Sequence, residues 1–161
     1  MQIIKDGTII HDDVQHLADA EAPTGNRFTV SFERWKAERE SLLAAGCAPG
    51  VRLSSGNALA DIAGDLPFLD LVVVEFPAFA DGRAFSLARL LRERYGYAGE
   101  IRARGDFIRD QLYFLVRVGV NAFEPKGGLD LEKLLPALKD FSVNYQAAAD
   151  DVELIYQKRG K

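Results

Sequence analysis

The chain has 161 residues, of which 48% are hydrophobic, and its formal net charge is -4. A chain of this length and apolar content buries enough surface to form one compact domain without disulfides or structural metals. The negative charge argues against a general nucleic-acid binder, because such proteins neutralise phosphates with a basic surface.

The single cysteine, Cys47, excludes an internal disulfide and suits a reducing compartment. We interpret it as a small apolar residue rather than a nucleophile, because neither His11 nor His16 is near it in the sequence. Residues 1–10 lack the basic and apolar regions of a secretory signal, and no apolar run approaches the roughly 20 residues that span a bilayer. We therefore expect a cytoplasmic protein with no membrane partner, folded as one α/β domain over residues 1–161.

The N-terminal part of the chain predicts a β-hairpin. Residues 2–11 read Q-I-I-K-D-G-T-I-I-H, with two apolar β-forming residues on each side of Asp6-Gly7. An Asp-Gly pair in this setting strongly favours a tight hairpin turn. Residues 12–26 are acidic and rich in small residues, with a proline and a glycine, so they are predicted to be a connector.

From residue 27 onward, strand-like and helix-like periods alternate, which is typical of βα units around a mostly parallel sheet. Branched apolar residues run without interruption through residues 69–76, so this segment is predicted to be a central strand covered on both faces. Five strands are expected in this part of the chain, at residues 28–30, 51–53, 69–76, 100–104 and 121–124.

Helices are predicted between and after these strands. Asn57 and Asp106 are suitable N-cap residues for two of them, and Pro136 should kink or split the last one. The predicted helices cover residues 32–43, 57–64, 82–95, 106–119 and 130–139.

About five βα units are too few for a closed eight-stranded barrel. We therefore predict an open, doubly wound, mostly parallel sheet with helices on both faces, and a barrel-like fragment as the alternative. Within this single domain we distinguish a hairpin and connector (1–26), a βα core (27–140) and a C-terminal extension (141–161).

Arginines gather where two strands of the predicted sheet end. In parallel α/β proteins, ligands bind at the carboxyl ends of strands, where loops and helix N-termini converge. Guanidinium groups beside the free N–H groups of a helix N-terminus form a site for sulfate, phosphate or a carboxylate. The candidate ligand-binding residues of this small-anion site are Arg83, Ser86, Arg102, Arg104, Arg109 and Gln111.

Carboxylates in the same segments leave other interpretations open. Asp81, Asp106 and Asp110 are candidates for the general acid or base of an enzyme that acts on an anionic small molecule. Alternatively, they pair with the arginines in a structural network, and the protein is an interaction module. The sequence identifies no reaction and does not decide whether the protein is an enzyme.

Sharper motifs are absent from the sequence. It contains no Walker loop, no dinucleotide-binding glycine pattern, no G-x-S-x-G elbow and no H-E-x-x-H. His11 and His16 have no third ligand at a useful spacing, so neither a metal site nor a cofactor is predicted. The aromatic residues suit core packing better than a base-stacking platform, so we predict no nucleic-acid partner.

Residues 76–123 resemble a bacterial family of unknown function whose members are often encoded beside the haemoprotein subunit of sulfite reductase. Some members are labelled oxidoreductases. The likeness extends more weakly back to residue 27 and forward to residue 146. The family pattern F-x-D-G-R-x-[YF]-S falls on Phe79, Asp81, Gly82, Arg83, Phe85 and Ser86. The pattern R-A-x-G-D-x-x-R-D-Q falls on Arg102, Ala103, Gly105, Asp106, Arg109, Asp110 and Gln111.

This resemblance implies a setting in assimilatory sulfur metabolism, with sulfite reductase as a partner and a small anion as the ligand, but it carries over no established activity. The chain departs from the family pattern at Phe85, where tyrosine is frequent, and at Val118, where cysteine is expected. No role of that hydroxyl or that thiol is therefore expected here. The hypothesis from the sequence is an accessory, anion-binding protein, with no prediction of its oligomeric state.

Overall fold

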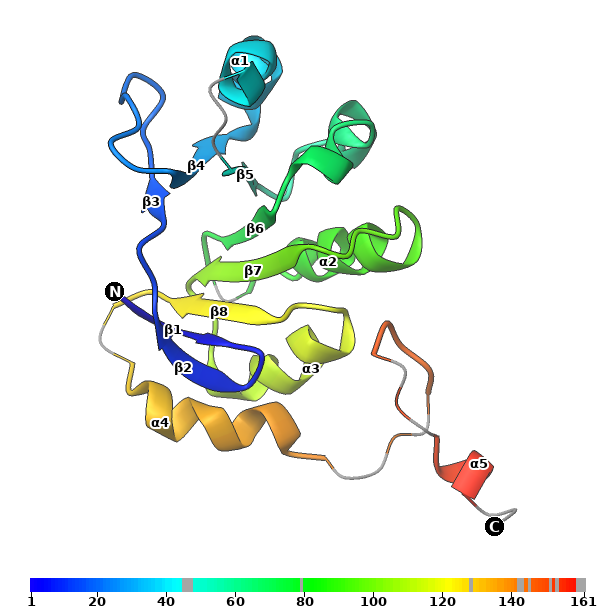
Figure 1. The fold of residues 1–161 in the computed structure, drawn as a ribbon. Coiled ribbons are helices and arrows are strands. Elements are labelled where there is room, and N and C mark those ends of the chain that lie inside the picture. Colours follow the sequence, from blue (N-terminus) through cyan, green and yellow to red (C-terminus); the bar gives the residue numbers. More distant parts are fainter. Residues whose placement is uncertain are drawn as a thin grey trace.

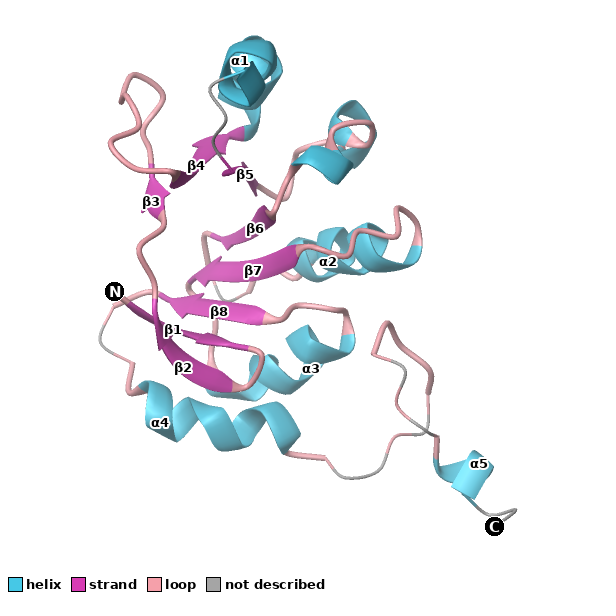
Figure 2. Cartoon of the chain, viewed as in Figure 1, coloured by secondary structure: helices cyan, strands magenta, loops and turns pink. Residues whose placement is uncertain are grey.

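The structure is a computed structural model that describes residues 1–44, 48–78, 80–127, 129–141, 144, 146–150, 152 and 154–158. Within these residues, eight strands form one mixed sheet in the order β2-β1-β8-β7-β6-β5-β4-β3. The sheet curls into a half-barrel, as Figures 1 and 2 show.

The strands are short, and those from β3 to β8 follow one another in chain order as parallel neighbours. They are β1 (Gln2–Lys5), β2 (Thr8–His11), β3 (Gln15–His16), β4 (Arg27–Ser31), β5 (Ala48–Leu53), β6 (Leu71–Phe76), β7 (Glu100–Gly105) and β8 (Ala122–Pro125). The helices are α1 (Phe32–Ala44), η1 (Leu59–Ile62), η2 (Leu66–Phe68), α2 (Arg83–Glu93), η3 (Arg109–Gln111), α3 (Leu112–Arg117), α4 (Leu131–Leu134), η4 (Leu135–Lys139) and α5 (Ile155–Lys158).

The N-terminal hairpin predicted from Asp6-Gly7 is confirmed. Asp6 and Gly7 have φ values of 49° and 74°, and two successive residues with positive φ are what a type I′ turn requires. β1 then pairs antiparallel with β8, so the hairpin extends the parallel part of the sheet by two antiparallel strands.

The convex face of the sheet carries the apolar core. In Figure 1, α1, α2 and α3 lie on this one side of the sheet. Trp35 of α1 is completely buried there, and its indole N–H donates to Asp65 at 2.9 Å. Other buried residues of this core are Phe28, Val30, Val51, Leu53, Val72, Val74, Leu87, Leu91, Ile101, Leu112, Leu115 and Phe123.

The prediction of a doubly wound sheet with helices on both faces is wrong. β7 shows the physical reason, because Ile101 and Ala103 pack in the helix-covered core while Arg102 and Arg104, which alternate with them, point to the concave face. A helix layer on the concave face would have to pack apolar side chains against these arginines and their carboxylate partners, and charges among apolar groups are costly. The barrel-like alternative is the one that the structure has, in the form of a half-barrel.

The two edges of the sheet are joined by a very short stretch of chain. β2 ends at His11 and β3 begins at Gln15, so residues 12–14 run from one edge strand to the other. Figure 1 shows this segment crossing the open side of the half-barrel. The backbones of Met1 and Asp12 exchange two hydrogen bonds of 2.7 Å, which hold the crossing segment against β1.

The other predicted elements are confirmed in part. All five predicted strands are present, and the last helix is split at Pro136 as expected, since α4 ends at Leu134 and η4 begins at Leu135. The segment after Asn57 forms the short 3-10 helix η1 rather than an α-helix, and the two-residue strand β3 was not predicted. Cys47 lies outside the described residues. Among the helices that the structure describes, none has the length and apolar content to cross a bilayer.

Candidate functional site

Arg102, one of the predicted ligand-binding residues, lies at the centre of the concave face and is completely buried. Its guanidinium pairs with Asp12 at 2.8 Å, Glu100 at 2.7 Å and Glu124 at 3.3 Å. Burial opposes its charge, but Asp12 and Glu100 raise the pKa of Arg102 above its ordinary value. Three carboxylates, from Asp12, Glu100 and Glu124, therefore surround the Arg102 guanidinium.

Arg83 and Asp81 lie at the start of α2 and bind each other. Asp81 accepts hydrogen bonds from Arg83 Nε at 2.9 Å and from the Ser55 hydroxyl at 3.0 Å. The Arg83 guanidinium lowers the pKa of Asp81 well below its usual range. The Arg83 side chain is 70% exposed, and Ser86 is exposed in the first turn of the same helix. Phe79, the first residue of this family pattern, lies outside the described residues.

Arg109 lies in a third environment, at η3. It pairs with Asp140 at 2.9 Å and more loosely with Asp110 at 3.5 Å. Gln111 accepts the backbone N–H of Ile108 at 3.1 Å, and Asp106 is exposed. The structure thus brings Arg102 and Arg104 together on β7, whereas Arg83 and Arg109 have carboxylate partners of their own.

One side chain from each of the six parallel strands takes part in a closed ring of polar contacts on the concave face. The ring runs through hydrogen bonds and ion pairs between neighbouring members, and the last member contacts the first. We refer to these six residues as the concave ring: His16, Thr29, Arg52, Glu75, Arg104 and Glu124.

Four neighbouring members of the concave ring form its buried half and are linked by hydrogen bonds. They are Glu124, His16, Thr29 and Arg52. His16 Nε2 lies 2.8 Å from Glu124 Oε2 and its Nδ1 lies 2.7 Å from Thr29 Oγ1, while Arg52 Nη1 donates to the same hydroxyl at 3.0 Å. Because a carboxylate only accepts, Nε2 carries a proton, and with a neutral imidazole Thr29 donates to Nδ1. Carboxylate, imidazole and hydroxyl also follow one another in hydrolytic triads. Thr29 is 0% exposed, however, so its hydroxyl is out of a substrate's reach.

The open half of the concave ring has looser contacts. Glu75 Oε1 lies 3.7 Å from Arg52 Nε and 3.4 Å from Arg104 Nη1. About a third of each side chain is exposed at Glu75 (33%) and Arg104 (37%). Burial lowers the pKa of Arg52, the charge of Glu75 opposes this change, and the charge of Arg104 adds to it. The open half thus consists of two guanidinium groups with one loosely held carboxylate between them.

A polar pocket of about 240 Å³ adjoins this open half. It lies where β4, β5 and β6 end and α1 begins, which is the carboxyl end of three neighbouring parallel strands. Asn57 accepts the N–H and the hydroxyl of Ser54 through its amide oxygen, at 2.7 Å and 3.0 Å. The lining residues are Ser31, Phe32, Glu33, Arg52, Ser54, Asn57 and Glu75.

Sequence reasoning identified Arg104 in this site but missed most of the concave ring. Arg52 stands between Val51 and Leu53, and this alternation was the available signal that its side chain leaves the apolar face. His16 and Thr29 carried no such signal, because their neighbours in the ring come from distant strands. Within the described residues, no group of three or more histidine, cysteine, aspartate and glutamate side chains is placed to hold a metal ion.

Fold and site together define an α/β half-barrel protein whose concave face is built from paired charges. Residues 50–156 match the family described as "Bacterial protein of unknown function (DUF934)". Because this match covers more than half of the chain, the protein belongs to that family. No curated protein matches the chain. The matched range includes Arg52, Glu75, Arg104 and Glu124 of the concave ring.

Proposed function

We propose that this protein is an accessory, anion-binding protein of assimilatory sulfur metabolism in the cytoplasm, and that a small oxyanion binds between Arg52 and Arg104. The observation that carries the proposal is the position of Glu75. Its carboxylate lies between the two guanidinium groups, at 3.7 Å and 3.4 Å, beside a pocket of about 240 Å³ at the carboxyl end of the strands.

Glu75 is held weakly enough for an external anion to compete with it. Charge-assisted hydrogen bonds between a guanidinium and a carboxylate are typically about 2.7–2.9 Å long. Arg104 makes such a bond with Glu124, at 2.9 Å, but its contact with Glu75 is longer, at 3.4 Å. An oxyanion that takes the place of Glu75 would find N–H donors of both arginines in position.

The electrostatics of the two arginines favour a further negative charge. The charge of Arg104 is among the causes that lower the pKa of Arg52, which means that the two guanidinium groups repel each other. One anion shared between them relieves this repulsion. Arg52 keeps its position in the process, because its Nη atoms donate to the backbone oxygens of Thr29 and Leu17, both at 2.7 Å.

The pocket suits a small ligand. At about 240 Å³ it is below the roughly 300–1,000 Å³ of pockets that hold drug-sized molecules, and its hydroxyl and amide groups suit an oxyanion. The genomic setting implied by the family resemblance makes sulfite the first ligand to test. No specific observation favours catalysis by Asp81, Asp106 or Asp110, none of which lines this pocket.

Isothermal titration with sulfite, sulfate and phosphate at low ionic strength tests the proposal. Arg104→Gln should weaken binding of the preferred anion about tenfold, since a hydrogen bond to a charged group contributes about 1.5–3 kcal/mol. Glu75→Gln should strengthen binding, because the competing carboxylate becomes neutral. Arg83→Gln is the matched control and should leave the affinity unchanged. If none of the anions binds, or if both arginine variants lose binding equally, the proposed site is rejected.

Sulfite reductase is the partner to test first. Immobilised protein should retain the haemoprotein subunit of sulfite reductase, and the same capture with Arg104→Gln separates two roles. If capture persists after anion binding is lost, the protein acts as an interaction module and the anion is not part of that contact. If no capture occurs with either form, this partner is rejected.

A further inference from the structure

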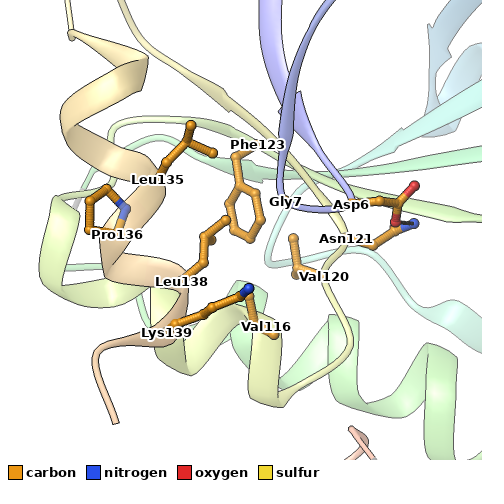
Figure 3. A pocket seen from close by; sticks show the side chains of 10 residues that line it. All are labelled: Asp6, Gly7, Val116, Val120, Asn121, Phe123, Leu135, Pro136, Leu138 and Lys139. Atoms are coloured by element: carbon orange, nitrogen blue, oxygen red, sulfur yellow. Dashed lines mark hydrogen bonds between the residues drawn. The ribbon is translucent and has the colours of Figure 1, made fainter. Parts of the chain in front are cut away.

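A larger cavity lies at the other end of β8, away from the concave ring. Its volume is about 560 Å³, which is within the range of pockets that bind small organic molecules. It is lined by the hairpin turn at Asp6-Gly7, by the start of β8, and by α3 and η4 (Figure 3). None of the candidate site residues predicted from the sequence, and neither arginine of the proposed anion site, lines this cavity.

The wall of the cavity is mainly apolar. The apolar side chains come from α3, from the start of β8 and from η4. They are Val116, Val120, Phe123, Leu135, Pro136 and Leu138. Such a wall favours a hydrocarbon or aromatic body, because removing apolar groups from water is favourable.

Two of the polar residues at the cavity are already engaged with each other. Asn121 donates its amide N–H to Asp6 at 3.1 Å, and its amide oxygen accepts the backbone N–H of Ile101 at 2.9 Å. In Figure 3 this pair lies together at one side of the cavity. The Asp6 carboxylate is thus held at the rim by a neutral amide.

Lys139 is the polar residue that remains for a ligand. It enters from η4, and in Figure 3 its amino group points toward the centre of the cavity. Among the described residues, no carboxylate lies within ion-pair distance of this amino group. The cavity therefore combines an apolar wall with one available positive charge.

We infer that this cavity binds an apolar monocarboxylate, with the hydrocarbon body against the apolar wall and the carboxylate paired with Lys139. Octanoate and 1-octanol are suitable probes, because they have the same chain length and differ in the charged head group. Binding is followed at pH 7 through the backbone amide signals of Val120, Asn121 and Leu138 in NMR titrations.

Octanoate should shift these signals in a saturable manner, and it should bind roughly twofold to fivefold more tightly than 1-octanol, the range expected for a partly exposed ion pair. Lys139→Met should abolish this preference. Lys133→Met is the matched control, since the Lys133 side chain is 83% exposed on the preceding helix, and it should keep the preference. Val116→Phe should weaken both probes by filling part of the cavity.

Three results overturn the inference. The first is that neither probe produces saturable shifts at these amides. The second is that octanoate binds equally well to the wild type, Lys139→Met and Val116→Phe. The third is that the same signals shift on dilution of the protein alone, which would mean that a second copy occupies the cavity. The outcome is independent of the proposed anion site, because Arg104→Gln should leave octanoate binding unchanged.

Discussion

Arg102 shows how strongly a single residue can depend on its partners. It is completely buried, and the side chains of Asp12, Glu100 and Glu124 around it are at most 9% exposed. Breaking a buried ion pair by removing one partner typically costs about 3–5 kcal/mol, because the remaining charge stays buried and unpaired. We therefore expect Arg102→Met to lower the free energy of unfolding by about that amount in urea titrations at pH 7.

Arg83→Met is the control for this experiment. The Arg83 side chain is 70% exposed, and exposed ion pairs contribute about 0–1 kcal/mol. If both variants lose the same stability, the charges around Arg102 do not act as a buried cluster. The double variant Arg102→Met with Glu100→Gln should recover part of the loss, which keeps the test informative if the single variant folds poorly.

Tyr97 provides a second prediction at the residue scale. Its hydroxyl donates to the backbone oxygen of Leu69 at 3.0 Å, and burial raises the pKa of Tyr97. Tyr97→Phe leaves that buried oxygen unpaired, so we expect a loss of about 1–2 kcal/mol at pH 7. Because the pKa of Tyr97 is raised in the folded state, its contribution to the free energy of unfolding is fully present below the unfolded pKa near 10. This contribution decreases at higher pH. Unfolding measured at pH 8 and pH 10.5 should show a smaller alkaline loss in Tyr97→Phe than in the wild type.

The sequence predicted that arginines of β7 lie near one another, but not which carboxylates they contact. Arg102 and Arg104 were singled out because they close a strand. Glu100 is near Arg102 in the sequence, but the other two acidic partners of Arg102 are distant, with Asp12 90 residues and Glu124 22 residues away. No local pattern encodes such pairs, because they depend on the order and curl of the strands.

At the scale of elements, Gly105 allows the backbones of β7 and β6 to approach each other closely. Its φ is 121°, and a Cβ atom built there would lie 2.3 Å from the backbone oxygen of Phe76. Gly105→Ala therefore combines an unfavourable backbone conformation, which costs about 1–3 kcal/mol, with a clash that only a backbone shift relieves. We expect a loss of at least about 2 kcal/mol in the free energy of unfolding, measured in urea.

Gly82→Ala is the matched control at the same end of the sheet. A Cβ atom at Gly82 would have nothing within 4 Å, and the residue has an ordinary helical φ of -74°. This substitution should change stability by less than about 1 kcal/mol, with a gain expected from reduced freedom of the unfolded chain. Equal losses for both glycines would contradict the close approach of β6 and β7.

Most elements could be predicted because their signals are local. The alternation in β7, E-I-R-A-R-G, was also a local signal, and it indicated a strand with one polar face. The continuous apolar run of β6 instead suggested helices on both faces. In the structure, Val73 of β6 lies on the concave face without a helix over it. It packs there against Leu71 of the same strand and against Val14 of the segment that connects the two edges of the sheet.

At the scale of the whole molecule, the curl of the sheet depends on contacts between strands that are not neighbours. β3 and β8 are separated by four strands in the sheet, yet His16 and Glu124 are joined at 2.8 Å across the concave face. Residues 12–14 connect the edges along the same side. The sequence could not reveal this closure, because it involves strands that are far apart in the chain, such as β3 with β8 and β1 with β8.

This closure should make the stability of the half-barrel sensitive to acid. Burial acts to raise the pKa of Glu124, but the hydrogen bonds and charges of His16 and Arg104 outweigh it and lower the pKa below its ordinary value. A carboxyl group with a lowered pKa in the folded state stabilises the protein above its unfolded pKa of about 4.3, and this contribution is lost as the pH falls through the folded pKa. The free energy of unfolding, followed through the single tryptophan Trp35, should therefore decrease below about pH 4.5 in the wild type.

Glu124→Gln isolates the contribution of the ring to this acid sensitivity. The variant should be less stable than the wild type at pH 6, because Arg104 and His16 lose a charged partner, but its stability should fall less steeply toward pH 3.5. Glu40→Gln removes an exposed glutamate of α1 and should keep the slope of the wild type. If Glu124→Gln also keeps that slope, protonation elsewhere causes the acid sensitivity. The contact between β3 and β8 would then be a consequence of the curl of the sheet and not one of its causes.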